Sequence, residues 1–461
     1  MEITIGTSRQ RVLLIQSYWV QPGQCSTSDP VYPLGLVYLA TAISGKHSVR
    51  IIDLCISESP WEDLSGAITD FSPDVVGISI RNADSFAYSD ISPLEDVSVY
   101  YCLNNLTRTL ITIKEAGFHG RIIVGGQTFS MFPERIMEHS KSIDFGVFLE
   151  GENTLPELLD NLDEPDSIKG LYLRKNGRIL FTGNRKHTNL AETGSPDRSL
   201  LPADRYIHSP EGIGIQSKRG CTLSCSYCIY PYLSGSLLRL REPFAVVDEM
   251  EEISREKIEC VHFVDPVFNI PQEHSEAICR EILRRDVRIK WIAWFHPRFL
   301  SGEYIDLCEK AGCVKFELSP DAYAQKGLDA LNKQITTKEI RNSLKLARGL
   351  TTSTITYNFL INHPGETVVS FFRKLIFCTK IKFTLSNKAR IEILNHIRIL
   401  PGTEVHRTAL SEGLIKPDTD MLPVCYEKMK LLFYKRSGLV NAFYRFLMLI
   451  LKVKHSFLRS S

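Results

Sequence analysis

Short apolar runs recur through the first third of the chain, and longer segments with helical spacing lie between them. The runs are residues 11–15, 49–53, 74–80, 121–124 and 144–148. Both faces of each run are apolar, which is typical of strands that are covered on both sides in a parallel sheet. The helical segments are residues 33–45, 59–70 and 100–116. This alternation predicts a doubly wound, Rossmann-like α/β domain over residues 8–165.

A second series of strand-like runs begins near residue 214. These runs are residues 214–217, 260–265, 289–295, 314–318, 354–361 and 391–399. Helical segments separate them at residues 244–257, 273–285, 302–311 and 337–349. Six repeated βα units predict a partial (β/α)6 barrel over residues 205–405, with ligands at the carboxyl ends of its strands.

The segment between these domains and the C-terminal region follow neither pattern. Apolar residues flank the turn-forming pair Asn176 and Gly177, so we expect a linker with a β-hairpin over residues 166–204. Residues 406–461 are expected to be a helical C-terminal extension. Within it, residues 439–458 have two interpretations. They form either a terminal helix packed on the barrel, with its lysines reaching solvent, or a helix that meets a membrane surface or a partner.

Composition narrows the class of protein. The 461 residues are 43% hydrophobic and 23% charged, so the chain can bury the cores of two or three domains. A formal net charge of +2 gives no broad basic field, so we expect no nucleic-acid partner. The sequence has no signal-peptide pattern, no apolar window long enough for a membrane span and no hydrolase elbow or phosphate loop. We therefore expect a cytoplasmic protein.

The twelve cysteines divide unequally. Nine stand at least five residues from any other, and we expect them to be small hydrophobes or incidental. Cys221, Cys225 and Cys228 form a CxxxCxxC loop after the first barrel strand. Three thiolates on one loop can bind three irons of a cubane cluster, leaving the fourth iron open to a small chelating molecule. Two alternatives stay open: a zinc site completed by His208 or Cys260, and three cysteines brought together by chance.

This loop, with Tyr227 just before its last cysteine, resembles the signature of radical S-adenosylmethionine (SAM) enzymes. In that family three cysteines hold a 4Fe–4S cluster, SAM chelates the fourth iron, and an electron from the cluster cleaves SAM to a 5′-deoxyadenosyl radical. Motifs at residues 260–269, 316–321, 328–340, 363–367 and 401–404 resemble those of the later strands and turns of the same family. The resemblance implies that SAM is bound by Tyr227, Asp265, Asn269, Glu317, Ser319, Gly365 and Glu366.

The order of the two domains resembles that of cobalamin-dependent radical SAM enzymes. Residues 33–36 (PLGL), the pair Gly125-Gly126 and residues 150–154 (EGENT) resemble motifs of their cobalamin-binding domain. Taken alone, the glycine pair is equally typical of an ordinary turn after a strand, and residues 81–84 of a solvated loop. The resemblance implies cobalamin contacts from Asp53, Ser79, Arg81, Asn82, Gly125, Gly126, Gln127, Glu150, Gly151 and Glu152.

One departure from the family pattern concerns cobalt. Classical cobalamin domains carry Asp-x-His-x-x-Gly, whose histidine becomes the lower cobalt ligand. The corresponding turn here, residues 53–57, reads DLCIS and has no histidine. The resemblance therefore implies base-off cobalamin without a histidine ligand. Our hypothesis is that Arg81 or Asn82 lies against the lower face of cobalt, where a cation would disfavour axial ligation.

These features predict a cobalamin-dependent radical SAM enzyme. The preferred reaction transfers a methyl group from SAM, via methylcobalamin, to an unactivated carbon of a biosynthetic intermediate. Rearrangement or cyclisation without methyl transfer is one alternative, and an iron–sulfur electron-transfer or binding protein without SAM chemistry is another. We expect a small-molecule or peptide substrate and an external electron donor such as flavodoxin or ferredoxin. His296 lies at the end of an aromatic-rich strand, which could form a substrate pocket or pack against the corrin; the alternative is a structural histidine.

Overall fold

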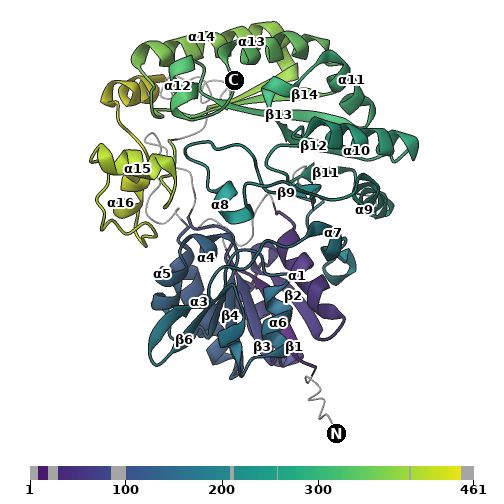
Figure 1. Cartoon of the computed structure of the whole chain (residues 1–461), viewed down its shortest axis with the longest axis vertical. Helices are drawn as coiled ribbons and strands as arrows, with labels where there is room; N and C mark the ends of the chain where they lie inside the picture. The colour runs from purple at the N-terminus through teal and green to yellow at the C-terminus, as the bar shows by residue number, and fades with distance from the viewer. Residues whose placement is uncertain are drawn as a thin grey trace, which may run out of the picture. The chain divides into compact units, whose positions relative to one another are not determined.

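A computed structural model describes residues 9–18, 30–84, 100–207, 212–256, 258–393 and 396–447. The chain divides into two compact units, with the main division between Gly214 and Ile215 (Figure 1). The first unit also includes Leu233–Gly235, and the second unit runs to the C-terminus. Residues 406–447 therefore belong to the same unit as the second series of strands and do not form a unit of their own.

The first unit is built on a seven-stranded sheet with the order β2-β1-β3-β4-β5-β6-β7. Its first five strands are β1 (Arg11–Gln16), β2 (Ser48–Asp53), β3 (Val75–Ser79), β4 (Arg121–Gly125) and β5 (Phe145–Val147). They run parallel. The helices that accompany them are α1 (Leu34–Ser44), α2 (Pro60–Phe71), α3 (Cys102–Glu115), α4 (Gln127–Met131), α5 (Pro133–His139) and α6 (Thr154–Asp160). The predicted doubly wound class is confirmed.

The predicted hairpin forms, but as part of this first sheet. Strands β6 (Leu171–Lys175) and β7 (Arg178–Phe181) meet at Asn176 and Gly177, whose φ angles of 52° and 75° suit the tight turn of a hairpin. Strand β6 pairs antiparallel with β5, and the Tyr172 ring contacts those of Phe148 and Phe129. The hairpin therefore extends the sheet past the expected boundary at residue 165, because its aromatic side chains complete the core of that sheet.

The second unit contains a six-stranded sheet with the order β15-β14-β13-β12-β11-β8. The strands are β8 (Gly214–Ile215), β11 (Cys260–Phe263), β12 (Lys290–Phe295), β13 (Cys313–Asp321), β14 (Thr354–Phe359) and β15 (Ala389–Ile393). Strands β11 to β15 pair in parallel. The main helices are α9 (Pro243–Arg255), α10 (Gln272–Arg284), α11 (Gly302–Lys310), α13 (Thr337–Leu346) and α14 (Val368–Leu385), and they lie along the outside of the strands in Figure 1.

Shorter elements and a C-terminal helix complete the described chain. The shorter elements are α7 (Leu190–Thr193), β9 (Lys218–Arg219), α8 (Tyr230–Ser234), β10 (Arg239–Leu240), α12 (Gln325–Ala330), α15 (Glu404–Ser411) and α16 (Tyr426–Met429). The C-terminal helix covers residues 438–447, and residues 448–461, the rest of the expected terminal helix, lie outside the described residues. No helix in the described ranges is both long enough and apolar enough to cross a membrane.

The two faces of the second sheet differ in polarity. Phe316 and Leu318 of β13 are buried on one face, where the Phe316 ring lies 4.7 Å from the Phe295 ring. Glu317 points to the other face, because side chains alternate along a strand. It lies in register between Trp294 of β12 and Thr356 of β14. The sheet therefore presents an apolar face to its helices and a face with polar positions opposite them.

Candidate functional site

The three-cysteine loop follows β9 in the second unit, and backbone hydrogen bonds hold it in place. All three thiols are free; Cys221 is buried, whereas Cys225 and Cys228 are partly exposed. The Cys228 amide donates to the Cys225 carbonyl at 3.0 Å, and the Tyr230 amide donates to the Cys228 sulfur at 3.4 Å. Three free thiols on one ordered loop are a suitable ligand set for a 4Fe–4S cluster.

Burial raises the pKa of each of these thiols, in the case of Cys228 to about 11. Without a metal the cysteines are therefore protonated at neutral pH, and binding of iron releases their protons. No three His, Cys, Asp or Glu side chains among the described residues are placed to hold a single metal ion. His208, one candidate for a fourth zinc ligand, lies outside the described residues.

Residues 331–334 clamp the cysteine loop from one side. The Ser226 amide donates to the Leu331 carbonyl at 2.9 Å, and the Asn332 side-chain amide donates to both the carbonyl and the hydroxyl of Ser224 at 2.9 Å. Asn332 has a φ angle of 49°, a left-handed conformation that asparagine tolerates better than most residues. The sequence showed this segment only as part of a family-like motif, and its contact with the cysteine loop comes from the tertiary fold.

A buried network of Tyr227, Asp321 and Lys333 lies under the same loop. The Tyr227 hydroxyl donates to Asp321 Oδ2 at 2.5 Å, and Lys333 Nζ lies 2.6 Å from the same oxygen. Lys333 Nζ also lies 3.3 Å from the Tyr227 oxygen. Burial acts to lower the pKa of Lys333, but the Asp321 carboxylate, together with Tyr227 and Cys225, outweighs it and raises the pKa well above the usual value. A lysine cation therefore faces the cluster loop, and the contact favours the Cys225 thiolate.

Asp265 and Asn269, both expected to contact SAM, make hydrogen bonds that build the site. Asp265 accepts from the Ser217 hydroxyl and from the amides of Ser217 and Lys218. The Asn269 amide group exchanges two hydrogen bonds with the His296 backbone, at 3.0 and 2.7 Å. These bonds hold the start of the cysteine loop against the turn after β11, and that turn against the end of β12.

Lys218 completes this junction and was not foreseen from the sequence. Its side chain is fully buried, and Nζ donates to the Phe268 and Ile270 carbonyls at 2.7 and 3.0 Å. In the sequence it looks like an ordinary surface lysine beside Arg219. Among the described residues, no acidic side chain lies within hydrogen-bond distance of its buried Nζ. The role of Lys218 in holding the turn after β11 is therefore visible only in the structure.

The remaining residues expected at the SAM site lie on β13 and on the turn after β14. Glu317 pairs with Lys315 on the polar face, and Ser319 follows two residues later on the same strand. Glu366 is held within its own turn by Lys374 Nζ at 2.6 Å and by the Asn362 amide. At Gly365 φ is 77°, and a Cβ would lie 2.9 Å from the Lys326 carbonyl, so this turn requires glycine.

His296 lies behind the Lys333 network. Its Nε2 lies 3.4 Å from the Lys333 carbonyl, and Nδ1 has no hydrogen-bond partner among the described residues. Burial lowers the pKa of His296 to about 4, so the ring is neutral at physiological pH. This environment favours the structural interpretation of His296, since the ring packs against protein and supports the segment that carries Lys333.

In the first unit, the residues expected to bind cobalamin gather where β2, β3 and β4 end. Asp53 accepts from the Cys55 amide at 2.8 Å and from the Tyr206 hydroxyl at 2.9 Å. Burial raises the pKa of Asp53. Burial also lowers the pKa of Arg81, against the influence of Cys55 and Asp53. Arg81 therefore lies near the turn at residues 53–57, which lacks a histidine. Asn82 is the next residue after Arg81.

The strand order reverses between β1 and β3, and ligands of open α/β sheets bind at such a point. Gln16 ends β1 there; it is buried, and its Nε2 has no acceptor among the described residues. An unpaired buried amide at this edge suits a polar ligand. Ser79 ends β3 beside it and pairs in register with both Gln16 and Gly125.

At Gly126 and Gly151 other parts of the chain pack closely against the backbone. At Gly126 φ is 94°, and a Cβ would lie 2.7 Å from the Ile80 carbonyl, so the turn after β4 requires glycine. At Gly151 a Cβ would lie 2.8 Å from the Leu39 side chain. Gln127, the first residue of α4, is exposed.

Glu150 and Glu152 lie in the turn before α6. Glu150 accepts from the Thr188 amide at 2.7 Å, and Glu152 is buried. The Glu150 bond ties this turn to the segment that follows the hairpin.

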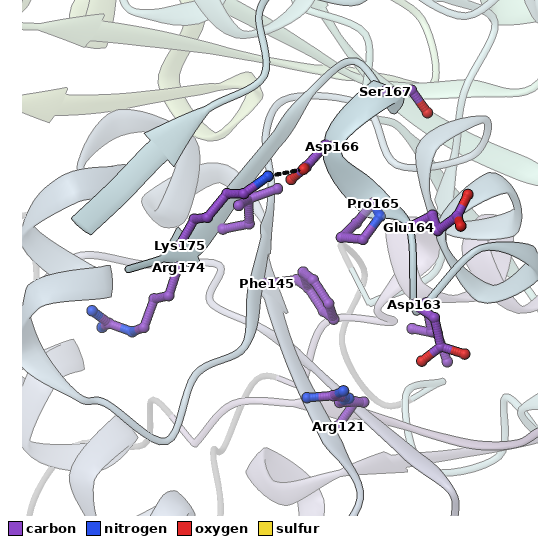
Figure 2. Close-up of a pocket in the computed structure, with 11 residues that line it drawn as sticks. Arg121, Phe145, Asp163, Glu164, Pro165, Asp166, Ser167, Arg174 and Lys175 are labelled. Atoms are coloured by element: carbon purple, nitrogen blue, oxygen red, sulfur yellow. Dashed lines mark hydrogen bonds and ion pairs between the residues drawn. The ribbon is translucent and has the colours of Figure 1, made fainter. Parts of the chain in front are cut away.

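A pocket of about 610 Å³ lies elsewhere in the first unit. Figure 2 shows it between Arg121, the first residue of β4, Phe145, the first residue of β5, and the ion pair of Lys175 with Asp166. It is therefore at the amino ends of these strands. None of the residues expected to bind cobalamin lines it, so we assign the candidate site to the carboxyl ends and not to this pocket.

Most of the other cysteines are buried in the core, as expected. Those that are buried are Cys55, Cys102, Cys279, Cys308, Cys313 and Cys378. Cys260 and Cys425 are partly exposed, and Cys25 lies outside the described residues. The sulfurs of Cys279 and Cys308 lie 4.0 Å apart, and both thiols are reduced.

Two parts of the chain match known protein families. Residues 26–159 match the B12 binding domain, and residues 215–373 match the Radical SAM superfamily. The first match ends within α6, and the second runs from β8 into α14. Each match therefore falls on one of the two sheets, and the second includes the cysteine loop.

Individual relatives are distant in sequence. The chain is 25% identical over 394 residues to an uncharacterized methyltransferase of Pyrococcus horikoshii, covering 83% of this chain and 79% of that protein. It is 24% identical over 358 residues to the anaerobic magnesium-protoporphyrin IX monomethyl ester cyclase of Rubrivivax gelatinosus, covering 74% of this chain and 61% of the cyclase.

A solved structure has the same fold. The radical S-adenosylmethionine methyltransferase TsrM from Kitasatospora setae, solved with cobalamin and a 4Fe–4S cluster bound, superposes with a TM-score of 0.73 at 22% identity. The match covers 88% of this chain and 75% of TsrM. The likeness therefore extends over both sheets.

Proposed function

This chain belongs to the cobalamin-dependent radical SAM enzyme family, and on that premise we propose that it is a methyltransferase. Its methyl acceptor is an unactivated carbon of a small-molecule or peptide intermediate. The observation that carries the proposal is the similarity, over 83% of the chain, to a protein named as a methyltransferase. An external one-electron donor such as flavodoxin or ferredoxin is part of the proposal, because radical cleavage of SAM consumes an electron.

In the proposed enzyme, Cys221, Cys225 and Cys228 hold the 4Fe–4S cluster. The cluster with SAM supplies a carbon-centred radical, and cobalamin supplies a carrier for the methyl group. The protein's own part is positional: Asp265 holds the start of the cysteine loop, and residues 331–334 hold its middle. Lys333 places a cation beside Cys225. Glu317 and Ser319, on the polar face of β13, are the proposed contacts for SAM.

The products distinguish methyl transfer from rearrangement, which the similarity to the cyclase of Rubrivivax gelatinosus favours as the second candidate. We expect the reconstituted, reduced protein to form S-adenosylhomocysteine and 5′-deoxyadenosine together, in about equal amounts, when it is supplied with its substrate. Liquid chromatography with mass spectrometry measures both. Deoxyadenosine without S-adenosylhomocysteine would instead support rearrangement, and no SAM cleavage at all would support an iron–sulfur protein without SAM chemistry.

For the cobalamin site, we propose that Arg81 would lie against bound cobalamin, where its cation would disfavour coordination of a further ligand to cobalt. Replacement by alanine removes a partly buried cation beside Asp53 and Cys55 and would let water approach the metal. We therefore expect Arg81→Ala to retain cobalamin but to shift its visible absorption spectrum towards that of a ligated form.

Arg50→Ala is the matched control, because Arg50 is an exposed residue of β2. Its spectrum should equal that of the parent protein. An Arg81→Ala spectrum that cannot be distinguished from the parent would contradict the assignment of Arg81.

A further inference from the structure

Helix α14 exposes a row of large apolar side chains. Val369, Phe372, Ile376 and Phe383 recur at helical spacing, so they lie on one side of the helix. Ile376 is 68% exposed, and Phe383 is 88% exposed. Single exposed apolar residues are ordinary, whereas a continuous row of them indicates a contact surface.

The C-terminal helix at residues 438–447 widens this row into a patch. Its Val440 and Tyr444 pack with Ile361 and Phe371 in one apolar core. Its other apolar side, formed by Leu439, Phe443 and Phe446, remains exposed.

The ring of Phe443 lies 5.1 Å from that of Phe372 on α14, so the two exposed rows are continuous. Both helices already have a packed face, and the exposed apolar residues are additional to it. We call the seven side chains the apolar patch: Val369, Phe372, Ile376, Phe383, Leu439, Phe443 and Phe446.

The charged residues of the two segments that carry the apolar patch have one sign. Residues 367–391 contain six Lys or Arg and no Asp or Glu, and residues 428–461 contain eight Lys or Arg and no Asp or Glu. Arg373, Lys380 and Lys382 on α14 and Arg445 on the C-terminal helix are exposed. Large apolar side chains bordered by Lys and Arg are typical of helices that lie in the surface of an anionic bilayer.

We propose that the apolar patch docks the protein on an anionic membrane surface, with the patch in the headgroup region and the flanking cations on lipid headgroups. A second copy of the chain is disfavoured as the binding partner of the apolar patch, because a twofold contact would place two basic surfaces against each other. Binding of residues 448–461 to the patch is disfavoured for the same reason, since the charged residues of that segment are all basic. Docking of this kind needs no membrane-spanning helix.

Flotation of the full chain with phospholipid vesicles tests the proposal. We expect binding to vesicles of phosphatidylcholine with about 30% phosphatidylglycerol, and much less to phosphatidylcholine alone, because the cations respond to lipid charge. The double variant Ile376→Glu/Phe383→Glu should lower the vesicle-bound fraction about tenfold or more, since it places two negative charges in the apolar patch.

Leu237→Glu is the matched control, because Leu237 is 79% exposed but lies outside both helices. It should float like the parent protein. Because Ile376 and Phe383 are largely exposed, the double variant should keep the parent's circular dichroism spectrum and thermal midpoint. Equal flotation of the double variant and the parent would overturn the proposal, as would equal binding to neutral and anionic vesicles. A parent dimer that the double variant converts to a monomer, without vesicle binding by either, would show an interface between copies instead.

Discussion

Replacement of Cys221, Cys225 or Cys228 by alanine is expected to abolish the retention of iron and acid-labile sulfide by the anaerobically reconstituted protein. Each cysteine supplies one of only three protein ligands to a cubane cluster, and a cluster with two ligands and no neighbouring substitute is readily lost. In the described part of the chain, no other cysteine lies on the loop. Iron and sulfide content per chain, measured after desalting, gives the result directly.

Cys260→Ala is the sharpest control for this experiment. Cys260 is partly exposed at the start of β11, and it is one of the two residues that a zinc site would recruit. The cluster assignment predicts that Cys260→Ala keeps full iron and sulfide content. Retention of iron by any of the three loop variants would contradict the assignment. Zinc without sulfide in the parent protein, lost on Cys260→Ala, would support the zinc alternative.

Lys333→Met is expected to cause the second large effect, by leaving Asp321 buried without its cation. The side chains of Lys333 and Asp321 are 9% and 3% exposed, and removal of one partner of such a pair costs about 3–5 kcal/mol. We expect that loss in the free energy of unfolding of the second unit. Reduced iron retention should accompany it, because the Lys333 segment holds the cysteine loop at Ser224 and Ser226. Urea denaturation of the full chain, followed by tryptophan fluorescence, measures the stability.

The double variant Lys333→Met/Asp321→Asn tests whether the pair itself is responsible. It removes both charges, so it should be more stable than Lys333→Met alone, and the difference measures their coupling. Lys326→Met is the matched control, since Lys326 is exposed on the nearby helix α12 and should change stability by no more than about 0.5 kcal/mol. A Lys333→Met variant as stable as Lys326→Met would show that the network makes no net contribution.

Much of the architecture could be predicted because its determinants are local. Strands such as β1 and β3 are covered on both faces, so their runs are continuously apolar and stand out between helical segments. The cluster loop could be predicted for a related reason: its three ligands lie within eight residues of the sequence. The hairpin could also be located from Asn176 and Gly177, but its membership of the first sheet could not. That depends on the contact of Tyr172 with aromatic residues distant in sequence.

The sequence by itself determined the fold class, the order of the two sheets and the position of the three cysteines. Only the tertiary structure decided what surrounds them. Lys218 and Lys333 are isolated lysines in the sequence, and such residues are mostly exposed; folding buries both beside the cysteine loop. Likewise, the many apolar positions of α14 do not by themselves reveal which are packed and which are exposed. Burial and pairing are properties of contacts between distant segments, and local patterns do not contain them.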